Sequence, residues 1–257
     1  VGLGSIGQRH LRNLRALYGN DLDISAYRSI GRDIRINDDM TVSANGDLER
    51  TYHVKIYHDY DEALRGAPDA AIIANPTKHH VPAALKAAQC GCHLLIEKPL
   101  SNNMAAVDEL SRAVKARGLV VMVGYQLRFN PCLKMIKDLL AANRIGQVIT
   151  ARSEFGEYLP DAHPYEDYRT GYAARKDLGG GALLSLSHEL DYLQWLFGMP
   201  EKIFALGGKL SALDMDVDDT DSLLMEHVVN GKREPVHVHL DFVQRPPVRT
   251  CSIVGVE

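Results

Sequence analysis

A glycine-rich turn at the start of the chain constrains the fold most strongly. Residues 2–7 fit the pattern G-x-G-x-x-G, and a helical pattern of leucines follows directly. Gly2 permits a tight turn, Gly4 lets backbone approach a pyrophosphate, and Gly7 lets the helix pack closely on a strand. Ser5 and Ile6 begin that helix, whose first N–H groups favour phosphate. The turn therefore predicts dinucleotide binding; the alternative is a tight turn with no ligand.

The first half of the chain alternates short apolar segments with helical patterns. Near-continuous apolar strands separated by helices indicate a parallel sheet covered on both faces. We therefore expect an α/β Rossmann domain over residues 1–123. The expected strands are 23–27, 54–57, 70–74, 93–96 and 119–123, and the expected helices are 7–17, 59–64, 81–90 and 103–116.

The pattern changes after Gly124, and we expect a second, α+β domain over residues 124–257. Period-two alternation over 147–158 predicts an antiparallel strand with one open face, and residues 182–197 predict one long, mostly apolar helix. A further helix is expected at 132–140, with strands near 202–208, 221–229, 235–243 and 249–256. We expect both ends to be incomplete, because Val1 directly precedes the glycine turn and the last strand has no closing element.

Composition excludes several classes of protein. The chain of 257 residues has a formal net charge of −4, which makes nucleic acid an improbable partner. No apolar run approaches the roughly 20 residues that span a bilayer, so no membrane association is expected. Cys90 and Cys92 lack the two-residue spacing of metal and redox motifs, so we expect no metal and reduced thiols in a cytoplasmic protein.

The end of the second expected strand bears on the choice of cofactor. NAD-binding domains place an acidic residue there, about 20 residues after the glycine turn, but this sequence has Arg28 and Ser29. A guanidinium matches the geometry of a 2′-phosphate, so we favour NADP over NAD. The alternative is that Arg28 is only solvated.

Several motifs together resemble the Gfo/Idh/MocA family, the glucose-fructose oxidoreductase and inositol dehydrogenase group. They are the glycine turn, Asn75-Pro76-Thr77-Lys78-His79-His80, Glu97-Lys98-Pro99-Leu100, the segment 124–131, and Gly179-Gly180-Gly181 leading to His188-Glu189-Leu190-Asp191. The resemblance implies a Rossmann domain followed by an open, mostly antiparallel sheet. It implies a hydride transfer between nicotinamide and a sugar or cyclitol carbon. A similar sub-group is tied to surface-sugar biosynthesis, which implies a sugar-nucleotide substrate.

The resemblance also implies roles for individual residues. Cofactor contacts are expected from Asn75, Pro76, His80, Glu97 and Lys98, besides the glycine turn and Arg28. Lys98 follows an expected strand at a carboxyl end of the parallel sheet, where ligands of this fold bind. The alternative for Lys98 is a surface lysine.

His188 matches the catalytic histidine, which shuttles the alcohol proton, and Asp191, which we also expect to be catalytic, lies one turn further on the same face. The alternative for His188 is a hydrogen-bonded core residue. Many relatives carry an aspartate four residues before the histidine, whereas this chain has Leu184, or Ser185 after a one-residue shift. We therefore expect an altered proton relay in which Ser185 acts through water.

Hydrogen-bonding side chains elsewhere in the second domain are candidates for binding the substrate; the alternative is a solvated loop. They are Tyr125, Arg128, Tyr168, Arg169 and Arg175, besides Ser185 and His188. Two other functions fit the same motifs: a non-catalytic, dinucleotide-binding sensor, and a glycoside hydrolase that recycles its redox cofactor. An open sheet needs cover, so we expect a homodimer or homotetramer.

Overall fold

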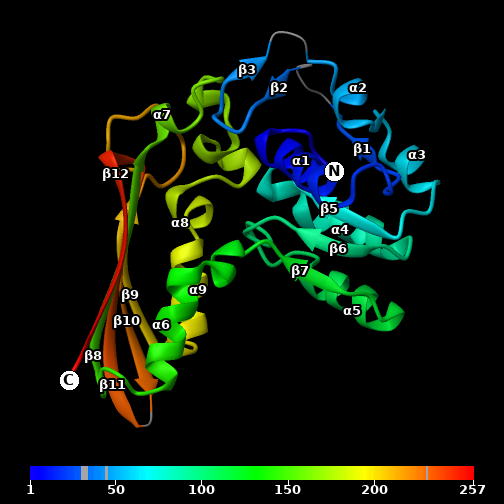
Figure 1. Cartoon of the computed structure of the whole chain (residues 1–257). Helices are drawn as coiled ribbons and strands as arrows, with labels where there is room; N and C mark the ends of the chain where they lie inside the picture. Colours follow the sequence, from blue (N-terminus) through cyan, green and yellow to red (C-terminus); the bar gives the residue numbers. More distant parts are fainter. Residues whose placement is uncertain (30–33, 44–45, 230) are drawn as a thin grey trace. The chain divides into compact units, whose positions relative to one another are not determined.

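The structure is a computed structural model that describes residues 1–29, 34–43, 46–229 and 231–257. The chain divides into two compact units (Figure 1). The first unit comprises residues 1–124 together with 163–166, and the second comprises residues 125–162 and 167–257. None of the helices in these described ranges is long and apolar enough to cross a membrane.

Short parallel strands form the centre of the first unit. They are β1 (Ser25–Tyr27), β4 (Lys55–Tyr57), β5 (Ala70–Ile73), β6 (His93–Ile96) and β7 (Val121–Val123). β1 pairs with β4, and β5, β6 and β7 pair in that order. Val1 and Gly2 connect the two groups. The Gly2 N–H donates to Tyr27, and Val1 exchanges backbone hydrogen bonds with the segment around Ile72 and Ala74.

The helices of the first unit pack on these strands. They are α1 (Ser5–Tyr18), α2 (Leu48–Tyr52), α3 (Tyr60–Leu64), α4 (His80–Gln89) and α5 (Val107–Arg117), and a small hairpin joins β2 (Arg35–Ile36) to β3 (Val42–Ser43). α4 is buried because its alanines lie on one helical face and let the backbone approach the strands closely. This arrangement confirms the expected Rossmann architecture.

A five-stranded sheet forms the second unit, in the order β12-β8-β11-β10-β9. Its strands are β8 (Val148–Tyr158), β9 (Lys202–Gly208), β10 (Thr220–Val229), β11 (Lys232–Asp241) and β12 (Val243–Gly255). β8 and β11 are parallel, and the other neighbouring pairs are antiparallel. The expected open, mostly antiparallel sheet is therefore confirmed.

One face of this sheet carries the core of the second unit. α6 (Pro131–Ala141), α8 (Ala182–Ser185) and α9 (His188–Phe197) pack against it (Figure 1). The inward residues of the strands, such as Ala151, Val236 and Leu240, are fully buried there. Short helices connect these elements: η2 (Gln126–Phe129), α7 (Leu159–Ala162), η3 (Tyr168–Thr170), η4 (Tyr172–Ala174) and η5 (Lys176–Leu178).

The single long helix expected over 182–197 is wrong, because α8 ends at Ser185 and α9 begins at His188. Leu186 closes α8 by donating its N–H to Ala182, and Ser187 accepts from the N–H of Asp191 to start α9. An apolar run does not reveal such a break, since both short helices bury the same kind of face. The break makes His188 the first residue of α9.

Other expectations need smaller corrections. The expected antiparallel pairing of β8 is confirmed with β12, but β8 lies parallel to β11, since period-two alternation shows which face is covered and not the direction of each neighbour. α5 begins at Val107 and not at residue 103, because Ala106 has a left-handed backbone that a helix does not continue through. β12 begins at Val243, and its prolines are tolerated because β12 lies at the sheet edge.

Candidate functional site

The glycines of the first turn have different structural requirements. Gly2 has a φ of +88°, and a Cβ there would lie 2.6 Å from the Ala74 carbonyl oxygen. A Cβ on Gly7 would lie 2.1 Å from the Gly2 carbonyl oxygen. Gly4 has extended backbone, and a Cβ there would meet nothing within 4 Å. Gly2 and Gly7 are therefore required by the fold, whereas Gly4 leaves space beside the first turn of α1.

The expected cofactor-contacting residues gather at one edge of the parallel strands. Arg28 and Ser29 follow β1, Asn75 and Pro76 follow β5, and Glu97 and Lys98 follow β6. Because parallel strands end on the same side, these residues share the carboxyl edge with the glycine turn, where ligands of this fold bind. Gly4 caps α1 without a side-chain hydrogen bond to the helix N–H groups, which suits a bound phosphate.

His80 connects two loops of this edge. Its side chain is 2% exposed, with Nδ1 2.8 Å from the Pro99 carbonyl oxygen and Nε2 2.7 Å from the Asn75 carbonyl oxygen. Burial lowers the pKa of His80, whereas the two carbonyl oxygens favour its charged form, since a neutral ring has one N–H and can donate to only one of them. Both ring nitrogens face backbone, so we interpret His80 as fixing the loops that carry Asn75 and Lys98.

Glu97 has a partner that the sequence did not indicate. His10 Nε2, on α1, lies 2.7 Å from Glu97 Oε1. Gly124 donates its N–H to Ile96 at 2.7 Å, and a Cβ on Gly124 would lie 3.1 Å from Glu97 Oε2. The Glu97 carboxylate is thus held between α1 and the end of β7, directly beside Lys98.

In the second unit, the sequence-predicted residues gather at the first turn of α9. His188 is 5% exposed and Ser185, at the end of α8, is 6% exposed. The ring of Tyr125 lies edge-on to the His188 ring, with centroids 5.7 Å apart. The Tyr125 hydroxyl donates to the Ser187 hydroxyl at 3.4 Å, and burial raises the pKa of Tyr125, so the phenol stays protonated at pH 7.

Arg128 and Asp191 bind each other. Arg128 Nε donates to Asp191 Oδ2 at 2.8 Å, and Arg128 Nη2 donates to Oδ1 at 2.7 Å. The Asp191 side chain is 8% exposed and the Arg128 side chain 41%. The sequence predicted a catalytic role for Asp191 and a substrate contact for Arg128, but it gave no sign of this pairing.

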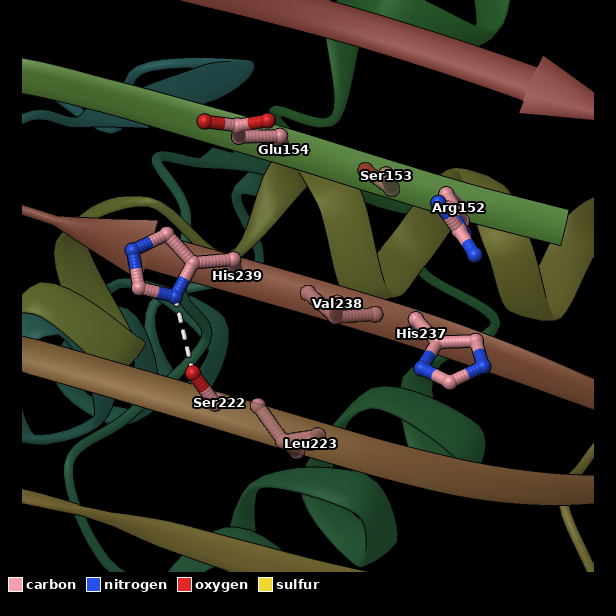
Figure 2. Close-up of a pocket in the computed structure, with 8 residues that line it drawn as sticks. All are labelled: Arg152, Ser153, Glu154, Ser222, Leu223, His237, Val238 and His239. Carbon is pink, nitrogen blue, oxygen red and sulfur yellow. Dashed lines mark hydrogen bonds between the residues drawn. The ribbon is translucent and has the colours of Figure 1, made fainter.

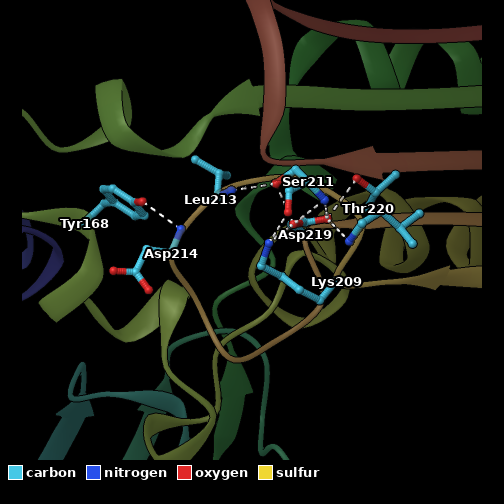
Figure 3. Close-up of polar contacts among 8 residues, drawn as sticks. Tyr168, Lys209, Ser211, Leu213, Asp214, Asp219 and Thr220 are labelled. Atoms are coloured by element: carbon cyan, nitrogen blue, oxygen red, sulfur yellow. Dashed lines mark hydrogen bonds and ion pairs between the residues drawn. The ribbon is translucent and has the colours of Figure 1, made fainter.

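The remaining candidates for substrate binding lie in the loop that precedes α8. Arg169 forms an ion pair with Asp167, and Arg175 forms one with Asp177, both at exposed positions. The Tyr168 hydroxyl accepts the N–H of Asp214 at 2.9 Å (Figure 3). These contacts order the loop itself, so a substrate-binding role for these residues stays a prediction.

A cluster of carboxylates closes the connection between β9 and β10. Burial opposes the charged form of Asp219, but donors from Ser211, Leu210 and Lys209 outweigh it and lower the pKa of Asp219 to about 2 (Figure 3). Burial and the neighbouring Asp218 raise the pKa of Asp221 to about 7. The sequence reasoning missed this cluster; the run of aspartates at 214–221 is the signal that could have indicated it, although its spacing does not show which member keeps a proton.

Asp218 also contacts the start of α8. The Leu183 N–H donates to Asp218 Oδ2 at 2.8 Å, and a Cβ on Gly181 would lie 2.2 Å from Asp218 Oδ1. Gly181 has a φ of +110°, which glycine adopts without strain. Glycine is therefore required here for two reasons, its backbone conformation and its lack of a side chain.

The sheet face away from α8 and α9 carries a separate hollow of about 250 Å³ (Figure 2). His239 Nδ1 lies 2.8 Å from the Ser222 hydroxyl there, and His239 Nε2 lies 3.3 Å from Asp241 Oδ2. Arg152, Glu154 and His237 line the same hollow. The sequence did not indicate this hollow, since alternation along single strands does not show which side chains meet across a sheet.

Two family models match the chain. The "Oxidoreductase family, NAD-binding Rossmann fold" model matches residues 1–125, and the "GFO/IDH/MocA C-terminal domain" model matches residues 133–255. Trans-1,2-dihydrobenzene-1,2-diol dehydrogenase of Oryctolagus cuniculus is 31% identical over 220 residues, covering 82% of this chain and 61% of the relative. The chain spans between 53% and 61% of the length of this relative and its counterparts from Bos taurus and Mus musculus.

Solved structures share the fold over nearly the whole chain. The WlbA dehydrogenase from Bordetella pertussis, in complex with NADH and UDP-GlcNAcA, has a TM-score of 0.81 at 20% identity, covering 99% of this chain and 75% of that one. GenD2 from gentamicin A biosynthesis, in complex with NAD, has a TM-score of 0.81 at 26% identity, covering 100% of this chain and 69% of that one.

Proposed function

The chain belongs to the Gfo/Idh/MocA family of oxidoreductases, and from this premise we propose that it transfers a hydride between a nicotinamide dinucleotide and an alcohol carbon. The observation that carries the proposal is the carboxyl edge of the parallel strands. There the open space at Gly4 and the first turn of α1 lie on the same side as Lys98. A dinucleotide needs a phosphate site, and hydride transfer from an alcohol is assisted by positive charge beside the oxygen that gains negative charge.

The residues present fit such a cofactor. The open side of Gly4 admits the pyrophosphate, and the uncapped N–H groups of α1 bind it. Asn75, Pro76 and Glu97 would hold the nicotinamide ribose, and Arg28 and Ser29 would hold the far ribose. When bound, the cofactor supplies or accepts the hydride.

We propose that Lys98 and His188 each act on the reacting hydroxyl. The Lys98 ammonium stabilises the oxygen as it gains negative charge. The imidazole of His188 takes the alcohol proton during oxidation and returns it during reduction. Because Leu184 stands where many relatives have a carboxylate, Ser185 passes this proton onward through water.

The substrate is proposed to be a sugar, a cyclitol or a sugar nucleotide. The support is the relatives: the WlbA structure holds UDP-GlcNAcA, and GenD2 comes from gentamicin A biosynthesis. The mammalian relatives at 31% identity act on a dihydrodiol by their name, which favours a vicinal diol as the shared chemical feature. Tyr125 and Ser185 are the proposed contacts to substrate hydroxyls beside His188.

We propose NADP as the preferred dinucleotide, because Arg28 offers a guanidinium where an acid would bind a free ribose hydroxyl. NAD is the alternative, favoured by the NADH and NAD found in the two similar structures. We further propose a cytoplasmic homodimer or homotetramer in which a second copy covers the outer face of the five-stranded sheet.

The test is turnover of NADP(H) or NAD(H), followed by absorbance, across a panel of sugars, inositols, UDP-sugars and vicinal diols. We expect stoichiometric conversion of cofactor and substrate with at least one member. Two other functions give a different result. A sensor would bind the dinucleotide and convert nothing, and a cofactor-recycling glycoside hydrolase would cleave a glycoside without net change in the cofactor.

A further inference from the structure

The short helix η2 contacts the first turn of α9 at several points. The Tyr125 ring lies edge-on to His188, its hydroxyl reaches Ser187, and Arg128 binds both carboxylate oxygens of Asp191. We call Tyr125 and Arg128 the η2 clamp. The clamp contacts three of the five residues from Ser187 to Asp191, and all three contacts lie within the second unit.

The ion pair between Arg128 and Asp191 is the strong part of the clamp. Two parallel N–H···O bonds fix the guanidinium and the carboxylate in one plane, which a single ammonium does not reproduce. The hydrogen bonds to Asp191 raise the pKa of Arg128 further, so its guanidinium stays charged. Since Asp191 is nearly buried, this charge pair resists displacement by water.

This geometry changes the role assigned to both residues. Asp191 uses both oxygens to hold η2, so its carboxylate serves as an anchor and not as the proton acceptor beside His188. Arg128 Nε and Nη2 donate to that carboxylate and not to substrate. His188 starts α9, where a helix frays most readily, so its orientation depends on what holds the first turn.

We infer that Arg128 and Tyr125 are positioning residues: through Asp191 and the edge-on ring contact, the η2 clamp sets the orientation of the His188 imidazole. The structural statement stands on the contacts alone, and its consequence for turnover rests on the proposed function. A loss of orientation of about 1 Å costs on the order of 100-fold in rate, so Arg128 matters to turnover without touching substrate.

The far end of α9 offers a matched control. Lys137, on α6, donates to the Trp195 carbonyl oxygen at 3.1 Å, and its ammonium lies 3.9 Å from the centroid of the Trp195 ring. Lys137 thus tethers the same helix from a neighbouring helix, two turns away from His188. A merely structural role for Arg128 predicts that Arg128→Met and Lys137→Met behave alike.

The first measurement uses the full chain without substrate. In Arg128→Met we expect faster hydrogen exchange at the amides of residues 188–191 and a displaced ring proton resonance of His188 by NMR. In Lys137→Met the His188 resonance should stay at the wild-type position. Tyr125→Phe keeps the ring contact and should leave the resonance nearly unchanged, whereas Tyr125→Leu should displace it.

The second measurement is kinetic. Arg128→Met should lower kcat by about 10- to 100-fold, while the Kd of the dinucleotide, which the first unit binds, stays within about twofold. Lys137→Met should keep kcat within about threefold. If Arg128→Met does not fold, both measurements are made on Arg128→Lys, because that variant keeps the charge and loses the bidentate hydrogen bonds.

The two proposals fail in different ways. An unchanged His188 resonance and unchanged exchange at 188–191 in the Arg128 variant overturn the clamp, whatever the turnover. Equal effects of Arg128→Met and Lys137→Met on the resonance overturn it as well. Absence of turnover in the wild-type protein, with the resonance displaced as expected, refutes the proposed function and leaves the clamp standing.

Discussion

Replacement of Gly4 by valine separates cofactor binding from folding. The backbone of Gly4 is extended, with φ −70° and ψ −170°, so a β-branched residue fits it without strain. A Cβ at this position meets nothing within 4 Å. The added side chain therefore occupies only the space proposed for the pyrophosphate.

The magnitudes differ enough to be decisive. Gly4 caps α1, and losing a good N-cap residue costs up to about 1 kcal/mol. Removing a glycine from the unfolded chain offsets this by about 0.4–1 kcal/mol. The free energy of unfolding should thus change by less than about 1 kcal/mol. Each charge-assisted hydrogen bond lost to the phosphates costs about 1.5–3 kcal/mol, so the Kd for dinucleotide should rise by at least about tenfold.

Two reference variants sharpen the assay. Gly66→Ala, whose Cβ would lie 3.7 Å from the Ala63 carbonyl oxygen, should leave the affinity unchanged and alter the free energy of unfolding by no more than about 1 kcal/mol. Gly7→Ala should unfold much more easily, since its Cβ would lie 2.1 Å from the Gly2 carbonyl oxygen. Chemical denaturation gives the stability, and NADPH or NADH fluorescence gives the affinity. A folded Gly4→Val protein with wild-type affinity refutes the assignment of this loop.

Further predictions follow from single contacts. Arg28→Asp should shift preference from NADP toward NAD, measured as the ratio of the two Kd values; a wild-type protein that already binds NAD more tightly contradicts the NADP assignment. Asp221 keeps a proton in the folded state that the unfolded chain loses above its ordinary pKa, so stability should fall as pH rises from about 4 to 7. In Asp221→Asn, which leaves Asp218 in place, the free energy of unfolding from denaturation curves should depend less on pH. The same pH dependence as in the wild type rules out the raised pKa of Asp221. Arg249→Met removes the partner 2.8 Å from the fully buried Glu189 and should cost about 1.5–3 kcal/mol of unfolding free energy, so a neutral effect speaks against that ion pair.

Local sequence patterns predicted most of the helices and strands of the first unit. β6 was predicted at its observed bounds, because a short apolar run flanked by Gly91 and Pro99 allows few other structures. The glycine turn was equally informative, since its spacing encodes a backbone geometry that the φ of Gly2 and the close contact at Gly7 bear out.

The sequence did not reveal contacts between segments that are far apart along the chain. Arg128 and Asp191 are 63 residues apart, and helical spacing alone placed Asp191 beside His188 without revealing its partner. The end of α8 at Ser185 was missed for a related reason. The turn is made by backbone hydrogen bonds that any sequence of this kind can form, so residue type gave no warning.

The most direct test of the account follows the hydride itself. Wild-type protein is incubated with reduced nicotinamide cofactor that carries deuterium at both positions of its transferring carbon, and with the oxidised form of whichever substrate turns over. Mass spectrometry then locates the label. We expect deuterium on the product carbon, with transfer reduced by at least about 100-fold in Lys98→Ala and His188→Ala while cofactor affinity is retained. Cofactor that keeps its deuterium throughout, or transfer that is unaffected by both substitutions, contradicts the account.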